Sequence, residues 1–131
     1  MGDKTLVESQ IDDSIRLIQK LDTDGNSPSL VLWYFYDDLD EWRLLVAGPV
    51  FDALLPKREH IAYGMLVEAM TSISPSYLSI SYLKLVVTNS PLAISLHSLI
   101  RTPSTGISRA YFSNTTLNGI FIKDMVILRC G

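Results

Sequence analysis

The segment Ser29-Leu-Val-Leu-Trp-Tyr-Phe-Tyr36 decides how this sequence folds, because it is apolar on both of its alternating faces. Side chains of a β-strand point alternately to opposite sides of the sheet. One side of this segment carries Leu30, Leu32, Tyr34 and Tyr36, and the other carries Val31, Trp33 and Phe35. Aromatic and β-branched residues on both sides are typical of a strand inside a sheet. We therefore predict an interior strand that is buried on both faces.

A second strand is predicted directly after the first. The acidic turn Asp37-Asp38-Leu39-Asp40 comes between them. Beyond the turn, one face would carry Trp42, Leu44 and Val46, and the other Arg43, Leu45 and Ala47. This alternation predicts a strand that pairs back on the first as a hairpin and ends at Gly48-Pro49.

A helix is predicted on each side of this hairpin. Thr5-x-x-Glu8 is a capping box, and apolar residues at helical spacing follow it, which predicts an amphipathic helix over residues 5–21. Residues 22–28 are dense in turn-forming residues and predict a loop. After the hairpin, a stripe of apolar residues predicts a helix that starts at Pro56 and ends before Ser74-Pro75.

The rest of the sequence predicts three further strands and one short segment that is either helical or extended. Residues 77–88 alternate as a strand does, and Ser90-Pro91 resembles a helix start, so residues 91–101 form either a short helix or an extended segment. Residues 107–117 and 120–130 flank Asn118-Gly119, a strong hairpin signal. The order αββαβ(α)ββ predicts a single α+β domain over residues 1–131, with two or three helices against a mixed, mainly antiparallel sheet.

Composition favours one ordinary apolar core in a cytoplasmic protein. The 131 residues are 47% hydrophobic and 19% charged, so burial can offset the entropy lost on folding. The first residues lack the apolar core of a signal sequence. The longest apolar stretch, Leu30 to Tyr36, is far shorter than the roughly 20 residues that span a bilayer. A single cysteine, Cys130, excludes an internal disulfide and a thiolate zinc cluster.

Charge is distributed unevenly along the chain. Residues 1–75 hold six Lys and Arg against thirteen Asp and Glu, whereas residues 76–131 hold five against one. The net charge of −3 argues against a nucleic-acid partner, since such binding rests on many cationic phosphate contacts. The asymmetry allows one half to face the other, within a chain or between subunits. Arg101, Arg109 and Arg129 are the candidates for contact with a partner.

Two groups of residues are candidates for a site. Asp37, Asp38, Asp40 and Glu41 could hold a metal ion in a small hydrolase or nuclease, although exposed acidic turns are commonly solubilising features. Trp33 and Trp42 could form an aromatic platform for a small ligand, although aromatic pairs across a hairpin are more commonly core. His60 and His97 have no ligand-spaced partners, and the glycine loops that bind nucleotides are absent from the sequence, so no cofactor is predicted.

Two segments carry a resemblance. The sequence resembles a family of small, stand-alone bacterial proteins of about this length at two places. The first is Trp42-Arg-Leu-Leu-Val-Ala-Gly-Pro49, which follows an aromatic strand and an acidic turn, and the second is Leu117-Asn-Gly-Ile-Phe-Ile-Lys-Asp124. The resemblance implies a bacterial cytoplasmic protein and carries over no activity, cofactor or catalytic residue.

These observations favour a non-catalytic interaction or accessory protein, acting as a homodimer through part of its sheet or its basic C-terminal half. The absence of catalytic motifs from the sequence, the charge asymmetry and a mean hydropathy of +0.22 motivate this hypothesis. A metal-dependent hydrolase or nuclease using the acidic turn, and a small-ligand sensor using Trp33 and Trp42, are the alternatives.

Overall fold

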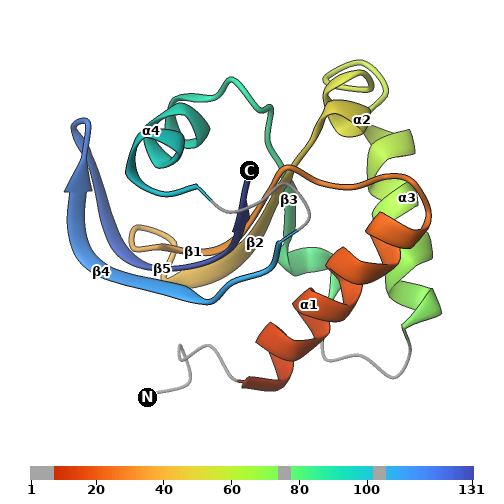
Figure 1. The fold of residues 1–131 in the computed structure, drawn as a ribbon, viewed down its shortest axis with the longest axis horizontal. Coiled ribbons are helices and arrows are strands. Elements are labelled where there is room, and N and C mark those ends of the chain that lie inside the picture. Colours follow the sequence, from red (N-terminus) through yellow and green to blue (C-terminus); the bar gives the residue numbers. More distant parts are fainter. Residues whose placement is uncertain (1–7, 74–77, 102–105) are drawn as a thin grey trace.

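The computed structural model describes residues 8–73, 78–101 and 106–131, and it forms one five-stranded sheet with helices on both sides (Figure 1). The helices are α1 (Glu8–Thr23), α2 (Pro49–Asp52), α3 (Glu59–Ser72) and α4 (Pro91–Leu99), with a short 3₁₀ turn, η1 (Ile80–Tyr82). The strands are β1 (Leu30–Tyr36), β2 (Glu41–Ala47), β3 (Leu83–Leu85), β4 (Ala110–Leu117) and β5 (Ile120–Cys130). None of the helices in the described ranges is long and apolar enough to cross a membrane.

Strand β1 lies at the centre of the sheet, whose order is β3-β2-β1-β5-β4. It pairs antiparallel with β2 on one side, from Leu30↔Ala47 to Tyr36↔Glu41, and antiparallel with β5 on the other. Among the described strands, β3 alone runs parallel to its neighbour, β2. The predicted α+β class and the mixed, mainly antiparallel sheet are therefore confirmed.

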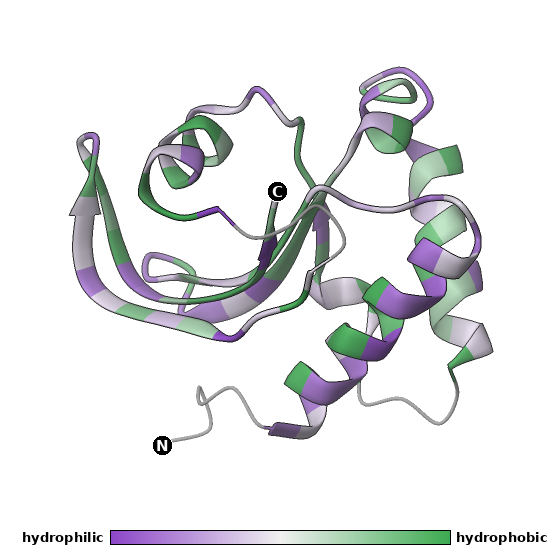
Figure 2. Ribbon diagram, in the orientation of Figure 1, coloured by the Kyte–Doolittle hydropathy of each residue, from purple (hydrophilic) through white to green (hydrophobic). Residues whose placement is uncertain are grey.

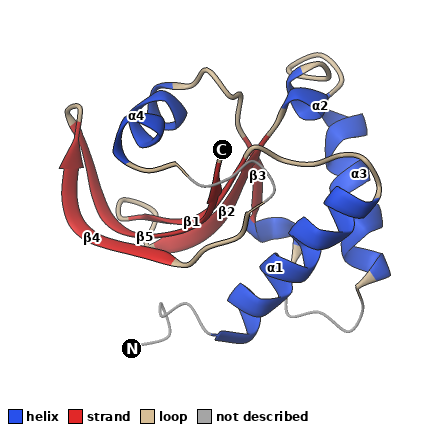
Figure 3. Ribbon diagram, viewed as in Figure 1, coloured by secondary structure: helices blue, strands red, loops and turns tan. Residues whose placement is uncertain are grey.

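The two apolar faces of β1 belong to two separate cores. Val31 and Trp33 pack into a core beneath α1 and α3, and Leu30 and Leu32 pack into a second core beneath α4. Figure 3 shows α1 and α3 next to each other and α4 separate from them. Helix α1 alternates between hydrophilic and hydrophobic positions along its length (Figure 2), so its apolar stripe can face the sheet. The predicted burial of this strand on both faces is confirmed.

Several predicted boundaries change because side chains cap or turn the chain. The predicted strand at 77–88 is wrong over most of its described length, since only Leu83–Leu85 is a strand. The Ser79 hydroxyl accepts the Ser81 N–H and starts a 3₁₀ turn before it, and the Asp52 carboxylate accepts the Thr88 N–H at 3.1 Å beyond it. These side-chain acceptors compete with the sheet for the backbone.

The helices also differ in number from the prediction. There are four in the described residues, because Pro49 starts an additional short helix, α2. Helix α3 begins at Glu59 rather than at Pro56. Residues 91–99 are helical, so the extended alternative is wrong, and the Ser90 side chain accepts the Ala93 N–H as an N-cap. The helix predicted at 5–21 is confirmed from Glu8 onward, whereas Thr5 of the capping box lies outside the described residues.

The hairpin of β4 and β5 curls around α4 (Figure 1). Asn114, in the middle of β4, has a φ of 49° and interrupts the alternation of side chains. Ala110 and Phe112 before it and Leu117 after it therefore all face the α4 core. A bulge in β5, at the register shift between Val31 and Leu32, adds further twist.

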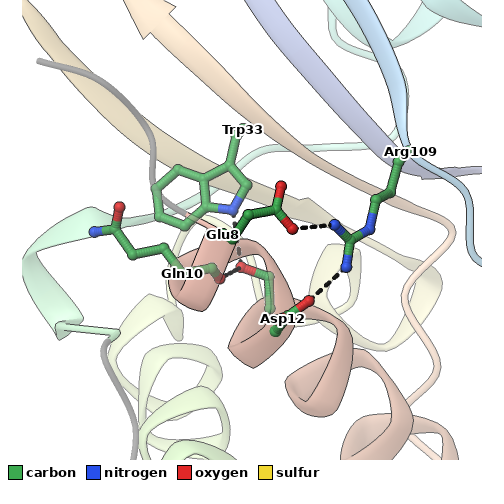
Figure 4. A network of polar contacts seen from close by, with 6 residues as sticks. Glu8, Gln10, Asp12, Trp33 and Arg109 are labelled. Carbon is green, nitrogen blue, oxygen red and sulfur yellow. Dashed lines mark hydrogen bonds and ion pairs between the residues drawn. The ribbon is translucent and has the colours of Figure 1, made fainter.

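Trp33 connects the sheet to α1 by a buried hydrogen bond (Figure 4). Its indole N–H donates to the Ser14 hydroxyl at 2.8 Å, and that hydroxyl donates to the Gln10 carbonyl at 2.7 Å. Trp33 and Ser14 are both fully buried. The bond satisfies a polar group that would otherwise lie in an apolar core.

We predict that Ser14→Ala lowers the free energy of unfolding by about 1–3 kcal/mol, because the buried indole N–H loses its acceptor. Ser72→Ala is the matched control: Ser72 is exposed on α3, and its hydroxyl also donates to the carbonyl four residues earlier. Urea denaturation followed by circular dichroism measures both variants. If the free energy of unfolding falls equally in the two variants, the hydrogen bond of the Trp33 indole contributes nothing to stability.

Candidate functional site

A cleft opens where β1 and β5 part from each other. Their ladder ends at Tyr34↔Met125, although β1 continues to Tyr36 and β5 begins at Ile120. The cleft has a volume of about 310 Å³ and is lined by Tyr34, Phe35, Tyr36, Asp37, Asp38, Phe121 and Lys123. It therefore combines one end of the central strand, the acidic turn and the start of the last strand.

Aromatic rings form much of the cleft wall. The rings of Tyr34 and Tyr36 lie 4.9 Å apart at an angle of 56°. The ammonium group of Lys84 lies over the Tyr36 ring, 5.1 Å from its centroid, in a cation–π arrangement. Phe121 is 55% exposed, which is unusual for a ring of its size. The cleft wall thus combines the exposed ring of Phe121 with the partly buried rings of Tyr34 and Tyr36.

Charged groups lie beside these rings. Lys123 lies 3.4 Å from the Asp37 carboxylate, and both side chains are about half exposed, so their ion pair is weak. Burial raises the pKa of Tyr34, and the nearby Tyr36 and Asp38 raise it further. The Tyr34 hydroxyl consequently stays protonated at neutral pH and can donate a hydrogen bond.

The acidic residues predicted as a metal site are separated by the fold. Asp37 and Asp38 line the cleft. Glu41 instead accepts hydrogen bonds from Arg43 across two residues of β2, and Asp40 occupies a turn position with a φ of 54°. Within residues 8–73, 78–101 and 106–131, no three His, Cys, Asp or Glu side chains are grouped to hold a metal ion.

The two tryptophans lie in different surroundings. Trp33 is fully buried and meets Tyr82 edge to face at 5.7 Å. Trp42 is half-buried and meets Phe35 edge to face at 5.4 Å, across the β1–β2 hairpin. A ligand platform at Trp33 is ruled out, because no face of its indole reaches solvent. The aromatic cleft lies instead on the neighbouring Tyr34 and Tyr36.

The three candidate arginines occupy different environments. Arg109 binds both Glu8 and Asp12 of α1 (Figure 4). Arg101 is exposed, and its Nε–H donates to the His97 carbonyl at 3.5 Å. Figure 4 shows the Arg109 guanidinium bridging two turns of the helix.

Arg129 is corrected as a partner-binding residue, because its side chain is fully buried. Its guanidinium binds both carboxylate oxygens of Asp22, at 2.8 and 2.9 Å, and donates to the carbonyls of Gly106 and Pro28. Together with Arg109 and Lys123, it pairs the basic half of the chain with acids of the other half. Basic residues of the C-terminal half thus pair with acidic residues of the N-terminal half within one chain.

The sequence patterns missed Phe121 and Lys123 as parts of a site. Both lie in a predicted strand, where alternation indicates only that they share a face. An apolar residue in a strand is ordinarily assigned to the core, so nothing local marked Phe121 as exposed. Its exposure follows from β5 running on past the end of β1.

Comparison of the chain with protein-family models, with curated proteins and with solved structures gave no match. The resemblance of residues 42–49 and 117–124 to a family of small bacterial proteins therefore stays a prediction.

We predict that Asp22→Asn lowers the free energy of unfolding at neutral pH by about 2–4 kcal/mol, since it leaves the Arg129 charge buried without its counter-ion. Arg129 lowers the pKa of Asp22 below its ordinary value of 3.8. The stabilisation is therefore complete above about pH 4 and is lost as the pH falls through the lower, folded-state pKa. The difference in the free energy of unfolding between Asp22→Asn and the original chain should therefore become smaller at acidic pH.

Asp24→Asn is the matched control for this prediction. Asp24 lies two residues away and forms a partly exposed pair with Lys20 at 3.1 Å, which is worth less than about 1 kcal/mol. Urea denaturation at several pH values measures all three chains. If Asp22→Asn lowers the free energy of unfolding no more than the control does, a structural role for the buried pair is contradicted.

Proposed function

We propose that this chain is a non-catalytic interaction protein that forms a homodimer through the open edge of strand β4. One observation carries the proposal: β4 is an edge strand of eight residues, Ala110–Leu117, with neither a charged residue nor a proline. The edge of a sheet offers unpaired N–H and C=O groups to another strand. Proteins that stay monomeric commonly protect such edges with charges, prolines or very short strands.

The opposite edge of the same sheet is protected in this way. Strand β3 has three residues, Leu83–Leu85, and its middle residue is Lys84. Strand β4 has none of these three devices, although its backbone is irregular at Asn114, and it presents Tyr111, which is 60% exposed. The contrast between the two edges supports association through β4.

Antiparallel pairing of β4 with its copy would join the two sheets into one. Such an interface places the same strand on both subunits around a twofold axis. Main-chain hydrogen bonds then provide affinity, and exposed side chains such as Tyr111 pack beside the axis. Arg109 precedes β4, but its charge is balanced by Glu8 and Asp12, which reduces repulsion between approaching copies.

We infer that the protein acts in the bacterial cytoplasm, without a nucleic-acid partner. The resemblance described above and the single cysteine support this location. Burial raises the pKa of the Cys130 thiol, which favours the unreactive protonated form. The net charge of −3 supports protein partners over nucleic acids.

We predict that Thr116→Lys raises the dimer dissociation constant about tenfold or more, because it places two like charges at the paired edges. Thr71→Lys makes the same change on the exposed face of α3 and should leave the dimer intact. Sedimentation velocity over a range of protein concentrations measures all three chains. Hydrogen exchange should show that β4 amides become protected as the dimer forms. A chain that stays monomeric, or a dimer whose β4 amides exchange freely, would refute the proposal.

A further inference from the structure

We propose that the cleft between β1 and β5 binds an extended basic peptide segment of a partner protein, with an arginine side chain of that segment held by Asp38 and the neighbouring rings. This site is separate from the β4 edge, because β5 lies between the two. The proposal therefore does not rest on self-association.

The backbone around the cleft is suited to an extended segment. Strand β5 pairs with β4 over its first residues, from Leu117↔Ile120 to Ser113↔Asp124, but it meets β1 only from Met125 onward. In the described part of the chain, residues 120–124 of β5 therefore have no strand partner on their β1 side. A strand-like peptide can take hydrogen bonds from such an open stretch.

Two lysines contact residues of the cleft wall and show which ligand chemistry these residues favour, although of the two only Lys123 lines the cleft itself. The Lys123 ammonium lies at the Asp37 carboxylate, and the Lys84 ammonium lies over the Tyr36 ring. One cation is thus bound by a carboxylate and the other by an aromatic face. A guanidinium can make both kinds of contact at once, because it is planar, stacks on rings and donates to carboxylates.

Asp38 is the carboxylate best placed for an incoming cation. Both carboxylates line the cleft, but Asp37 is paired with Lys123, whereas the negative charge of Asp38 acts on Tyr34. The Tyr34 hydroxyl can donate to an acceptor on the ligand, such as a peptide carbonyl. Exposed Phe121 provides a ring on the opposite strand.

The size of the cleft favours a side chain over a larger ligand. A volume of about 310 Å³ lies at the lower limit of small-molecule pockets, which enclose most of their ligand. A single arginine side chain fits such a volume, and the remainder of the peptide would follow the open edge of β5. The ligand is therefore expected to be part of a chain.

The binding test is an NMR titration with a short blocked peptide of alternating valine and arginine. The amide signals of Asp37, Asp38, Phe121 and Lys123 should shift. The same peptide with citrulline in place of arginine keeps the shape but lacks the charge, and it should bind at least about tenfold more weakly. Equal binding of the two peptides, or shifts confined to another surface, would overturn the proposal.

Three substitutions separate the roles of the charges. Asp38→Asn should weaken peptide binding about fivefold, as expected for the loss of an exposed ion pair. Asp40→Asn is the matched control, because it removes the same charge from the same turn without lining the cleft, and asparagine tolerates its φ of 54°. Lys123→Gln should tighten binding severalfold, because it removes the ammonium that competes for Asp37. A gain of affinity cannot arise from loss of folding.

Two further arms test the peptide and the independence of the site. Acetyl-arginine amide supplies the cation without an extended backbone and should bind at least about tenfold more weakly than the peptide. Equal affinity for acetyl-arginine amide and for the peptide would mean that the cleft is a site for small cations, and it would refute the proposal that the ligand is a peptide segment. The Tyr111→Lys variant changes the β4 edge opposite Val126, which does not line the cleft, and it should bind the peptide as the original chain does. Loss of binding in that variant would refute the independence of the cleft from the β4 edge.

Discussion

Burial of β1 from both sides holds the remainder of the fold in place. One face of the strand contributes Trp33 to the core under α1 and α3, and the other contributes Leu32 to the core under α4. Each large apolar side chain buried in this way stabilises the fold by about 2–3 kcal/mol. A strand with a core on each face needs neighbours on both edges, and β2 and β5 provide them.

Polar contacts then orient the chain around this strand. The Trp33 indole is joined to Ser14 of α1, and buried Arg129 is joined to Asp22 at the end of the same helix. Arg109 adds a third connection to α1, through Glu8 and Asp12. The basic C-terminal half and the acidic N-terminal half thus attract each other inside one molecule.

The curvature that closes the second core also creates the two surfaces proposed for binding. Asn114 lets the β4–β5 hairpin bend around α4, so that Ile122 and Leu117 reach the apolar core. The same bend takes the start of β5 away from β1, which opens the cleft beside Phe121. The strand order makes β4 an edge strand of the sheet that the described residues form. Packing on one face is therefore linked to exposure at the edges.

Local patterns in the chain were enough to establish the class, the central strand, both hairpins and the amphipathic α1, because alternation and helical spacing reflect contacts made by neighbouring residues. They also identified Asp37 and Asp38, though as metal ligands. The three-dimensional arrangement alone set the pairing of Arg129 with Asp22, the exposure of Phe121 and the convergence of Tyr34, Asp38 and Lys123. These features join residues far apart in the chain, and they follow from how far two strands run side by side, which no local periodicity encodes.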